Sequence, residues 1–479
     1  MVMELLYANA EADPGHPALV YGDERLSRAE LVDRVERVAR GLAARGIGAG
    51  DAVALVLPND PLFVAGFLAV TGLGAIVVPL NPQLKPDELD FSFRACRVRA
   101  VIADERSSSQ CQRVLAGMEE PVQLLTSTTM TRLIEHHPPA ALAPRSPGEA
   151  FVYQFSSGST GRPKRVERTH AQCRSEAESY GWITSGDRLF CAIPLFHTYG
   201  MGCCLLAAVR SGATLVLLDE PNPFLLRRHR ALELLERERV TVFPGVPFNF
   251  RLLAEAPAHA DLSSLRLCFS AGTALPRPVF DAFMRRFGVP VRQLYGCTEA
   301  GTLTANLDPD PVATFQSVGA PVGDVRVAVD AETGEIAVSS PAMTRGYCDV
   351  EALNREVFRD GWFRTGDLGR LDAACRLYVT GRRKLLIEVA GHKVDPIEVQ
   401  DVVVAHPKVR EAVVLGVKRS GVPEESVKAV VVSSDGCRER EVIEFCRERL
   451  ANYKVPHVVE FRDEIPKSPL GKVLRKYLV

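Results

Sequence analysis

Nine residues carry the strongest signal for the fold: Ser156-Ser157-Gly158-Ser159-Thr160-Gly161-Arg162-Pro163-Lys164. Glycines let a backbone approach an anion closely, successive N–H groups form a cationic nest, and hydroxyl groups add neutral hydrogen-bond donors. The run follows an apolar stretch at 151–155, as a phosphate-binding loop does when it leaves a strand. No Gly-Lys-Ser/Thr closes the run, so it is not a Walker A loop. It predicts a nucleotide site, and the alternative is a surface loop that is merely rich in glycine and serine.

Length and charge indicate a multidomain protein that acts on a small molecule. At 479 residues the chain exceeds what one hydrophobic core usually covers, so we expect at least two domains. The formal net charge is −1 and the isoelectric point is near 6.8. These values give no electrostatic footprint for nucleic acid or for an anionic membrane.

Cysteine usage and the N-terminus predict a cytoplasmic location. The twelve cysteines are scattered and form no CxxC pair, which is typical of reduced thiols and argues against a zinc site or a disulfide framework. Residues 1–5 lack the basic and apolar pattern of an export signal, and no apolar run is long enough to span a membrane.

The sequence before residue 312 alternates helix and strand patterns. Within residues 25–50 we expect an amphipathic helix with a capping box of Ser27 and Glu30 and an end at Gly46. Its apolar face is formed by Leu31, Val35, Val38 and Leu42. Further helix patterns lie at 61–71 and 202–210, and strand patterns lie at 52–57, 75–80, 189–194, 213–218 and 240–243. This alternation is typical of an α/β fold with largely parallel sheets.

The pattern changes after residue 312. Short apolar runs at 325–329 and 335–339 around a turn predict antiparallel β structure. The polar cluster 381–384 separates two apolar runs, so we place a domain boundary between a large domain, 1–383, and a small α+β domain, 384–479. The small domain's first helix is expected to start with Asp395 as N-cap, Pro396 as first residue and Glu398 as capping-box partner, and strands are expected at 411–417 and 428–432. The stretch 125–150, which contains four prolines, is expected to be a surface connection.

Four further motifs follow the glycine-rich run in a fixed order. They are Tyr295-Gly296-Cys297-Thr298-Glu299, Gly361-Trp362-Phe363-Arg364-Thr365-Gly366-Asp367, the cluster 381–384 leading to Gly391, and Pro466-Lys467-Ser468-Pro469-Leu470-Gly471-Lys472. With residues 156–164, their order and spacing resemble the adenylate-forming superfamily of acyl-CoA synthetases, carrier-protein adenylation domains and luciferases. The resemblance covers nearly the whole chain. It implies a large N-terminal domain of α/β subdomains with an antiparallel β region, and a small mobile α+β C-terminal domain.

The resemblance also implies how ATP would be bound. Glu299 matches the family's magnesium-binding glutamate, and a hard carboxylate suits Mg²⁺. Thr298 would hydrogen-bond the α-phosphate, Asp367 would accept hydrogen bonds from the ribose hydroxyls, and Arg382 would support the same sugar. The phosphates would lie against Ser156, Ser157, Gly158, Ser159, Thr160, Gly161 and Lys164. Adenine would lie along Gly272, Thr273 and Ala274 and stack on Tyr295, which precedes Gly296; an ordinary strand-to-loop segment and a core tyrosine are the alternatives.

Three positions in the C-terminal part match moving parts of the family. Lys472 fits the mobile catalytic lysine that meets the carboxylate and the α-phosphate, a task suited to a flexible ammonium. Lys384 stands at the family's hinge. Gly391 matches the glycine that swings towards the active site for the second half-reaction and lets a pantetheine arm pass.

His197 carries the most information about the acid. Amino-acid-activating members of the family usually have an aspartate after the phenylalanine that corresponds to Phe196, where it pairs with the α-ammonium. A histidine cannot provide that negative charge, so we expect an acid without an α-amino group; a core histidine is the alternative. The candidate pocket walls are His197, Tyr199, Phe243, Val246, Cys297 and Leu303.

Two positions depart from the family pattern, and the resemblance implies that the second of them lies close to the path of the second substrate. Arg165 stands where many relatives have glycine, and Glu388 stands where lysine is common. We expect a Mg²⁺-dependent ligase that joins an aromatic or medium-chain carboxylic acid to coenzyme A through an acyl-adenylate and releases AMP and pyrophosphate. The alternatives are loading of the phosphopantetheine of a free-standing carrier protein, transfer to a non-thiol acceptor, and a silent acyl-nucleotide sensor.

Overall fold

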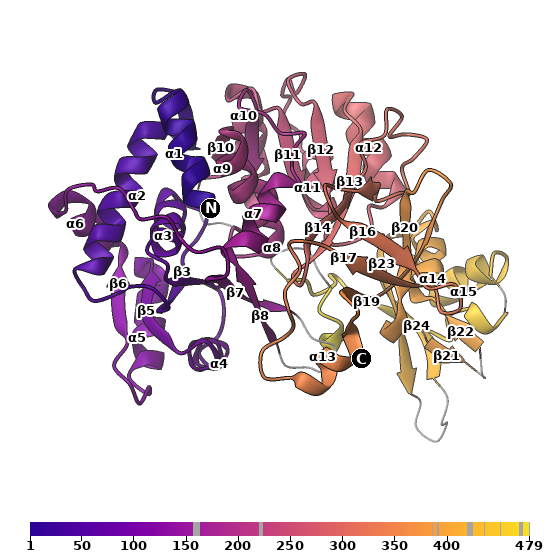
Figure 1. The fold of residues 1–479 in the computed structure, drawn as a ribbon. Coiled ribbons are helices and arrows are strands. Elements are labelled where there is room, and N and C mark those ends of the chain that lie inside the picture. Colours follow the sequence, from indigo (N-terminus) through magenta and orange to yellow (C-terminus); the bar gives the residue numbers. More distant parts are fainter. Residues whose placement is uncertain are drawn as a thin grey trace. The chain divides into compact units, whose positions relative to one another are not determined.

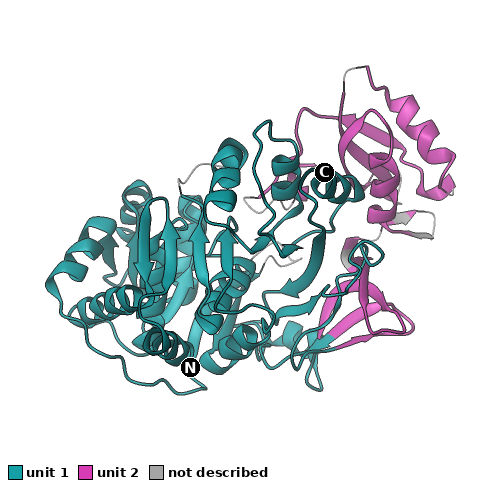
Figure 2. Cartoon of the chain, turned by 90° about the horizontal axis from the view of Figure 1, so that it is seen from above, with its two compact units in different colours: residues 1–326, 338–362 teal, residues 327–337, 363–479 magenta. Residues whose placement is uncertain are grey.

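The computed structural model divides into two compact units. It describes residues 1–156, 163–219, 224–385, 387–389, 392–418, 425–434, 436–450, 452–468 and 473–478. The first unit comprises 1–326 with 338–362, and the second comprises 327–337 with 363–479 (Figure 2). The boundary expected between residues 383 and 384 lies inside the second unit, and it stays a prediction.

The first sheet of the first unit is mostly parallel and is covered on both faces. Its strand order is β6-β5-β3-β4-β7-β8, and only the β7–β8 pair is antiparallel. The strands are β3 (Ala52–Val56), β4 (Ile76–Pro79), β5 (Val98–Ala103), β6 (Gln123–Thr126), β7 (Ala150–Ser156) and β8 (Lys164–Thr169). The helices are α2 (Arg28–Ala43), α3 (Pro61–Gly72), α4 (Pro86–Cys96), α5 (Glu105–Leu115) and α6 (Ser127–His136). All five residues of β3 are buried, as two covered faces require.

Of the predictions from local sequence signals in this region, one is confirmed, one differs by three residues and one is wrong in part. The capping box of α2 is confirmed, because the Glu30 amide donates to Ser27 Oγ and the Ser27 amide donates to the Glu30 carboxylate. The helix ends at Ala43, three residues before the predicted Gly46. The prediction for 125–150 was wrong in part, since α6 lies within it. Thr126 caps this helix, and its Met130 and Leu133 are buried.

The second sheet of the first unit has the order β15-β14-β13-β12-β11-β9-β10-β1-β2. Its strands are β1 (Pro17–Tyr21), β2 (Glu24–Ser27), β9 (Arg188–Cys191), β10 (Thr214–Leu217), β11 (Val242–Gly245), β12 (Leu267–Ser270), β13 (Val291–Cys297), β14 (Gly301–Ala305) and β15 (Ala320–Pro321). The helices are α1 (Val2–Ala12), α7 (His170–Glu178), α8 (Thr198–Gly200), the π-helical turn η1 (Met201–Leu206), α9 (Ala207–Ser211), α10 (Phe224–Arg237), α11 (Pro247–Ala254) and α12 (Arg277–Phe287).

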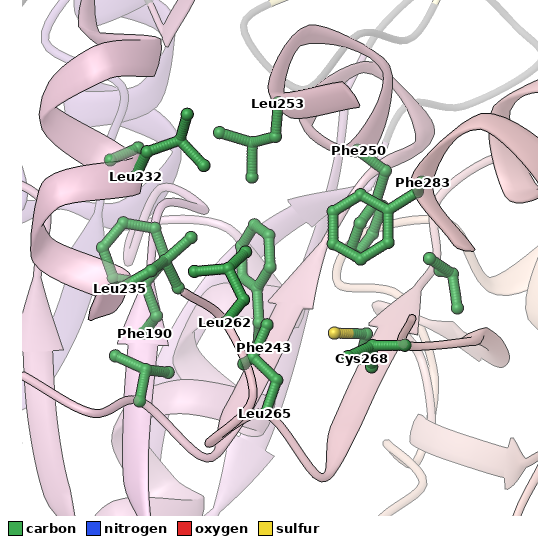
Figure 3. Close-up of a cluster of buried hydrophobic side chains, with 14 of the residues drawn as sticks. Phe190, Leu232, Leu235, Phe243, Phe250, Leu253, Leu262, Leu265, Cys268 and Phe283 are labelled. Carbon is green, nitrogen blue, oxygen red and sulfur yellow. The ribbon is translucent and has the colours of Figure 1, made fainter. Parts of the chain in front are cut away.

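One face of this sheet carries a large apolar core. Helices α10, α11 and α12 lie beside β11 and β12 (Figure 1). Side chains from these helices pack on strand residues such as Phe190, Phe243 and Cys268 (Figure 3). The apolar faces of the helices therefore fix the positions of these strands.

The remaining elements confirm an α/β fold that ends in β-rich and α+β parts. One sheet contains β16 (Arg326–Val329), β17 (Glu335–Ser339), β18 (Phe358–Arg359), β19 (Trp362–Leu371) and β20 (Leu377–Arg382), with β19 and β20 antiparallel. A second contains β23 (Val409–Lys418), β24 (Glu425–Ser433) and β25 (Val458–Phe461), and a hairpin joins β21 (Ile387–Val389) to β22 (His392–Val394). The helices are α13 (Glu351–Val357), α14 (Pro396–Val404) and α15 (Glu439–Arg447), with short turns η2 (Arg383–Leu385), η3 (Asn452–Lys454) and η4 (Arg475–Tyr477).

The start of α14 corrects one prediction. Asp395 is the N-cap, but its side chain accepts from the amide of Ile397. The predicted capping-box partner, Glu398, instead forms an ion pair with Lys454.

All twelve cysteines are free thiols, and eight of them are buried. Within the described residues, no helix combines the length and the apolar character needed to cross a bilayer.

Candidate active site

The carboxyl ends of four parallel strands meet at one edge of the second sheet. Strands β9, β11, β12 and β13 are neighbours and run parallel. The segments that follow them carry His197 after β9, Val246 after β11, Gly272–Ala274 after β12, and Thr298 with Glu299 after β13. Ligands of parallel α/β sheets bind beyond this edge. The fold therefore gathers most of the predicted residues of the first unit on one side of the sheet.

The loop after β9 is fixed by Asn59, a residue that the sequence did not single out. In the side chain of Asn59, Nδ2 donates to the carbonyl of Ile193 at 2.7 Å and Oδ1 accepts from the main-chain amide of Leu195 at 2.7 Å. His197 then caps α8, because its Nδ1 accepts from the Tyr199 amide at 3.2 Å. With Nδ1 accepting, the neutral ring carries its hydrogen on Nε2. This imidazole can therefore donate a hydrogen bond to an acid.

The helix predicted at 202–210 starts earlier and contains a π turn. Residues 198–200 form α8, and η1 follows directly. Gly200 permits a close approach, since a Cβ there would lie 2.2 Å from the carbonyl oxygen of Pro194. π turns occur frequently at functional sites, and this one directly follows the His197 segment.

The turn between β13 and β14 carries Thr298 and Glu299. Gly296 allows the two strands to approach, because a Cβ there would lie 2.6 Å from the carbonyl oxygen of Gly301. Thr198 Oγ1 donates to Thr298 Oγ1 at 3.4 Å. This contact joins the β9 loop to the β13 turn, so the two segments with the most specific predictions touch.

Glu299 is buried and is held by Tyr347, a residue that no sequence motif singled out. The hydroxyl of Tyr347 donates to Glu299 Oε1 at 2.7 Å. Burial, reinforced by the Glu299 carboxylate, raises the pKa of Tyr347 well above its ordinary value, so the hydroxyl stays protonated. The Lys164 ammonium lies 4.8 Å from the centre of the same ring. Tyr347 thus links the predicted metal ligand to the end of the phosphate-loop motif.

A buried polar network backs this turn. Arg168 and Glu176 form an ion pair whose side chains are 0% and 1% exposed. Tyr180 donates to Glu176 at 3.2 Å and lies 2.6 Å from Thr302 Oγ1. A Cβ at Gly301 would lie 2.8 Å from the Glu176 carboxyl carbon. The network therefore joins β8 and α7 to β14, the strand that begins two residues after Glu299.

The Glu299 carboxylate fits a magnesium ion that is bound together with a nucleotide. In the part of the chain that the structure describes, no group of three or more His, Cys, Asp or Glu side chains could hold a metal. Mg²⁺ commonly takes one or two protein carboxylates and fills its other positions with phosphate oxygens and water. The buried Glu299 carboxylate suits that pattern.

The second unit holds its own predicted pair. Asp367 and Arg382 lie opposite each other on the antiparallel strands β19 and β20. Arg382 Nε donates to Asp367 Oδ1 at 2.5 Å, and Asp367 is buried while the arginine side chain is half exposed. The pair presents a carboxylate whose orientation is fixed by a guanidinium.

The structure places the remaining predicted residues as follows. Ser156 and Lys164 pair across β7 and β8, whereas Ser157, Gly158, Ser159, Thr160, Gly161, Gly391 and Lys472 lie outside the described residues. The main chain of Lys384 is in η2. Gly272, Thr273 and Ala274 are exposed, and Tyr295 is half-buried in β13.

The predicted pocket walls differ in their surroundings. Tyr199 donates from its hydroxyl to the carbonyl of Phe269 at 3.2 Å. Val246 and Leu303 are buried, and Cys297 is half-buried. Phe243 lies within the apolar core among Phe190 and Phe250 (Figure 3). Their assignment to a pocket stays a prediction.

Comparison with known proteins is consistent with this geometry. Residues 6–348 match the family model of the AMP-binding enzymes, and residues 398–472 match the model of the AMP-binding enzyme C-terminal domain. A feruloyl-CoA synthase from an Amycolatopsis species is 34% identical, over 97% of this chain and 96% of that protein.

Two solved structures extend the comparison. ATP-bound MatB from Rhodopseudomonas palustris superposes with a TM-score of 0.90 at 28% identity, covering 99% of this chain and 97% of that one. The anthranilate CoA ligase AuaEII in complex with anthranoyl-AMP gives a TM-score of 0.89 at 26% identity, covering 100% and 96%. This chain therefore belongs to the AMP-binding enzyme family and is an enzyme of its AMP-forming acyl- and aryl-CoA ligase group.

Proposed function

We propose that this enzyme joins a carboxylic acid to coenzyme A in two steps, through an acyl-adenylate, with release of pyrophosphate and AMP. The observation that carries the proposal is the contact between Thr198 and Thr298, which brings the His197 segment and the Glu299 turn together at the carboxyl edge of the second sheet. An acid held at the first segment and a triphosphate held at the second would then meet. Holding both reactants in this way removes much of the entropic barrier to their reaction.

The residues that would hold the nucleotide fall into three groups. The loop 156–164 would bind the phosphates, Thr298 the α-phosphate, and Glu299 a Mg²⁺ ion that offsets phosphate charge. Residues 272–274 and Tyr295 would contact adenine. Asp367 would accept hydrogen bonds from the ribose hydroxyls, and Arg382 would support the same sugar by holding Asp367. Glu299 accepts a hydrogen bond from Tyr347, whereas Asp367 accepts one from Arg382. These different donors support different tasks for the two carboxylates.

The acid would lie beside His197. The Nε2 hydrogen inferred from the Tyr199 contact can donate to a carboxylate, and an imidazole offers no anion for an α-ammonium. We therefore infer an aromatic or medium-chain acid without an α-amino group. The names of two similar proteins, a feruloyl-CoA synthase and an anthranilate CoA ligase, support an aromatic acid.

Three residues of the C-terminal part would complete the cycle. Lys472 would act during adenylation, Gly391 would line the thiol path afterwards, and Lys384 would be the hinge of a small domain at 384–479. Coenzyme A is the proposed acceptor because the similar proteins named above include CoA ligases. A carrier protein or a non-thiol acceptor is an outcome that the experiment must distinguish.

The test is a screen of carboxylic acids for ATP-dependent pyrophosphate release. Each active acid is then followed with CoA, with a carrier protein bearing phosphopantetheine, and with neither thiol. We expect release with aryl or medium-chain acids and an acyl-CoA product. Release with α-amino acids alone would refute the substrate class, and acyl transfer only to the carrier would refute CoA as the acceptor.

A further inference from the structure

We propose that Tyr347 is a positioning residue that orients the Glu299 carboxylate for a nucleotide-bound divalent cation. The proposal rests on the proposed function in one respect, the assignment of Glu299 as the metal ligand. It concerns a residue to which no motif of the sequence pointed. The evidence is the way in which a single segment holds Glu299 at two points.

That segment comprises residues 343–348 and is called the strap. The amide of Thr344 donates to the main-chain carbonyl of Glu299 at 2.8 Å, and the hydroxyl of Tyr347 donates to its carboxylate at 2.7 Å. Both the backbone and the side chain of Glu299 are therefore bonded to the strap. A carboxylate on a turn that is fixed at one point can rotate, whereas two points define its orientation.

The strap itself is anchored on β8, the strand that follows the phosphate-loop motif. Thr344 Oγ1 donates to the carbonyl of Glu167 at 2.7 Å, and the Cys348 amide donates to the carbonyl of Arg165 at 3.0 Å. Tyr347 also forms an isolated antiparallel bridge with Val166. The strap therefore fixes the distance between the end of the phosphate-loop motif and the Glu299 turn.

The backbone of Tyr347 is clasped by one side chain. The Tyr347 amide donates to Asn354 Oδ1 at 2.8 Å, and Asn354 Nδ2 donates to the Tyr347 carbonyl at 2.7 Å. Both polar atoms of the Asn354 side chain therefore form hydrogen bonds with the main chain of Tyr347. Such a clasp fixes the main chain from which the ring projects, as a residue that orients another side chain requires.

The chemistry of a phenol suits this task. A hydroxyl that donates to Oε1 leaves Oε2 available to a cation, and it adds no positive charge that would weaken the attraction. A lysine or arginine in the same place would offset the carboxylate's charge. The ring face of Tyr347 meanwhile contacts the Lys164 ammonium, a favourable cation–π geometry. One neutral side chain thus contacts both the anion that would bind the metal and the cation that would bind phosphate.

The test compares Tyr347→Phe with Tyr7→Phe. Tyr7 is a matched control, since its hydroxyl donates to Glu36 Oε1 at 2.9 Å and both Glu36 and Glu299 are 8% exposed. Binding of Mn²⁺ to the enzyme with a non-hydrolysable ATP analogue is measured by electron paramagnetic resonance. Pyrophosphate release is titrated with Mg²⁺ in parallel. Outer-sphere partners of metal ligands typically contribute 10- to 100-fold to metal affinity.

We expect Tyr347→Phe to raise the Mn²⁺ dissociation constant and the half-saturating Mg²⁺ concentration by about tenfold. Affinity for the metal-free analogue and the rate at saturating Mg²⁺ should change much less, and Tyr7→Phe should match the wild type in every measurement. Unchanged or tighter Mn²⁺ binding in Tyr347→Phe would overturn the proposal. The proposal would also be overturned if Tyr347→Phe lowered the Mn²⁺ affinity of the Glu299→Gln variant as much as it lowers that of the wild type. The effect of Tyr347 must act through Glu299.

Two further points keep the test decisive. If Tyr347→Phe fails to fold, Asn354→Ala loosens the clasp instead, and it must weaken Mn²⁺ binding in the same direction or the proposal fails. Should the wild-type enzyme release no pyrophosphate with any acid, the proposed function fails. The Mn²⁺ measurement still decides the role of Tyr347 in that case.

Discussion

Two carboxylates predicted to handle the nucleotide have opposite surroundings. Glu299, in the first unit, accepts a hydrogen bond from the neutral hydroxyl of Tyr347 at 2.7 Å. Asp367, in the second unit, accepts one from the Arg382 guanidinium at 2.5 Å. Both carboxylates are buried to a similar degree, at 8% and 6% exposure. The difference between them therefore lies in the charge of the donor and not in access to water.

A carboxylate that accepts from a neutral donor and one that accepts from a charged donor suit different ligands. A cation is attracted by net negative charge, which a neutral phenol leaves in place. A ribose hydroxyl needs an acceptor held in the right direction, and a guanidinium can hold the acceptor even though it offsets the charge. We therefore expect removal of charge to cost far more at Glu299 than at Asp367.

The largest effect is expected from Lys472→Ala, which tests whether the C-terminal region contributes charge to adenylation. Adenylation should fall by about 10²- to 10³-fold, because a cation that meets the α-phosphate in the transition state is lost. Thioester formation from supplied acyl-adenylate should be largely retained. The measurement is the single-turnover rate of each half-reaction.

Two variants control this experiment. Lys467→Ala removes a nearby lysine that is paired with Glu411 and should leave both half-reactions intact. Gly391→Leu should slow thioester formation and spare adenylation, since a bulky side chain would obstruct the thiol path. Equal slowing of one step by Lys472→Ala and Gly391→Leu would show that the two half-reactions do not use different residues.

Glu299→Gln should give the next largest effect. The amide keeps the size of the side chain and its ability to accept from Tyr347 but removes the negative charge, so adenylation should fall by about 10²-fold. Pyrophosphate release is measured over a Mg²⁺ titration, with Glu36→Gln as a control at the other buried tyrosine–glutamate pair. A near-normal rate at saturating Mg²⁺ would place the metal on another group.

Asp367→Asn should cost about tenfold in the KM for ATP, the scale of one charge-assisted hydrogen bond, with a small change in kcat. The matched control is Asp372→Asn, because Asp372 pairs with Arg376 at 2.7 Å near the turn that joins β19 to β20. Steady-state kinetics over ATP concentration measure the effect. A loss as large as that of Glu299→Gln would remove the distinction drawn between the two carboxylates.

The sequence predicted those parts of the fold and site whose signals are local. The Ser27–Glu30 capping box was predictable because its partners lie three residues apart. The same rule was wrong at Glu398, where an ion pair with Lys454, 56 residues away, competes for the carboxylate. Helix α6 was missed because the four prolines of 125–150 are typical of a connection, although all four of them follow the helix.

Prediction of the candidate site was likewise limited to residues that lie close together in the sequence. Thr298 and Glu299 stand in one short motif, so the sequence could select them together. Tyr347 lies 48 residues from Glu299, and Asn59 lies 136 residues from Leu195. No periodicity or spacing marks such pairs, because only the folded chain brings them together. The π turn after His197 was missed for a related reason, since residues 202–210 carry an ordinary apolar helix pattern.

The smallest effect is expected from Arg382→Gln, which isolates the donor that distinguishes the two carboxylates. The Arg382 side chain is 51% exposed, and ion pairs with an exposed partner contribute about 1 kcal/mol or less, so the KM for ATP should rise by up to about fivefold. Since salt screens an exposed charge, the difference from wild type should shrink when ionic strength is raised. Arg376→Gln, which loosens the neighbouring pair with Asp372, is the control and should leave the KM for ATP unchanged. ATP titrations at low and high salt measure both variants. A loss above about tenfold that persists at high salt would mean that Arg382 contacts the nucleotide with a desolvated charge, and its role as a support for Asp367 would then be wrong.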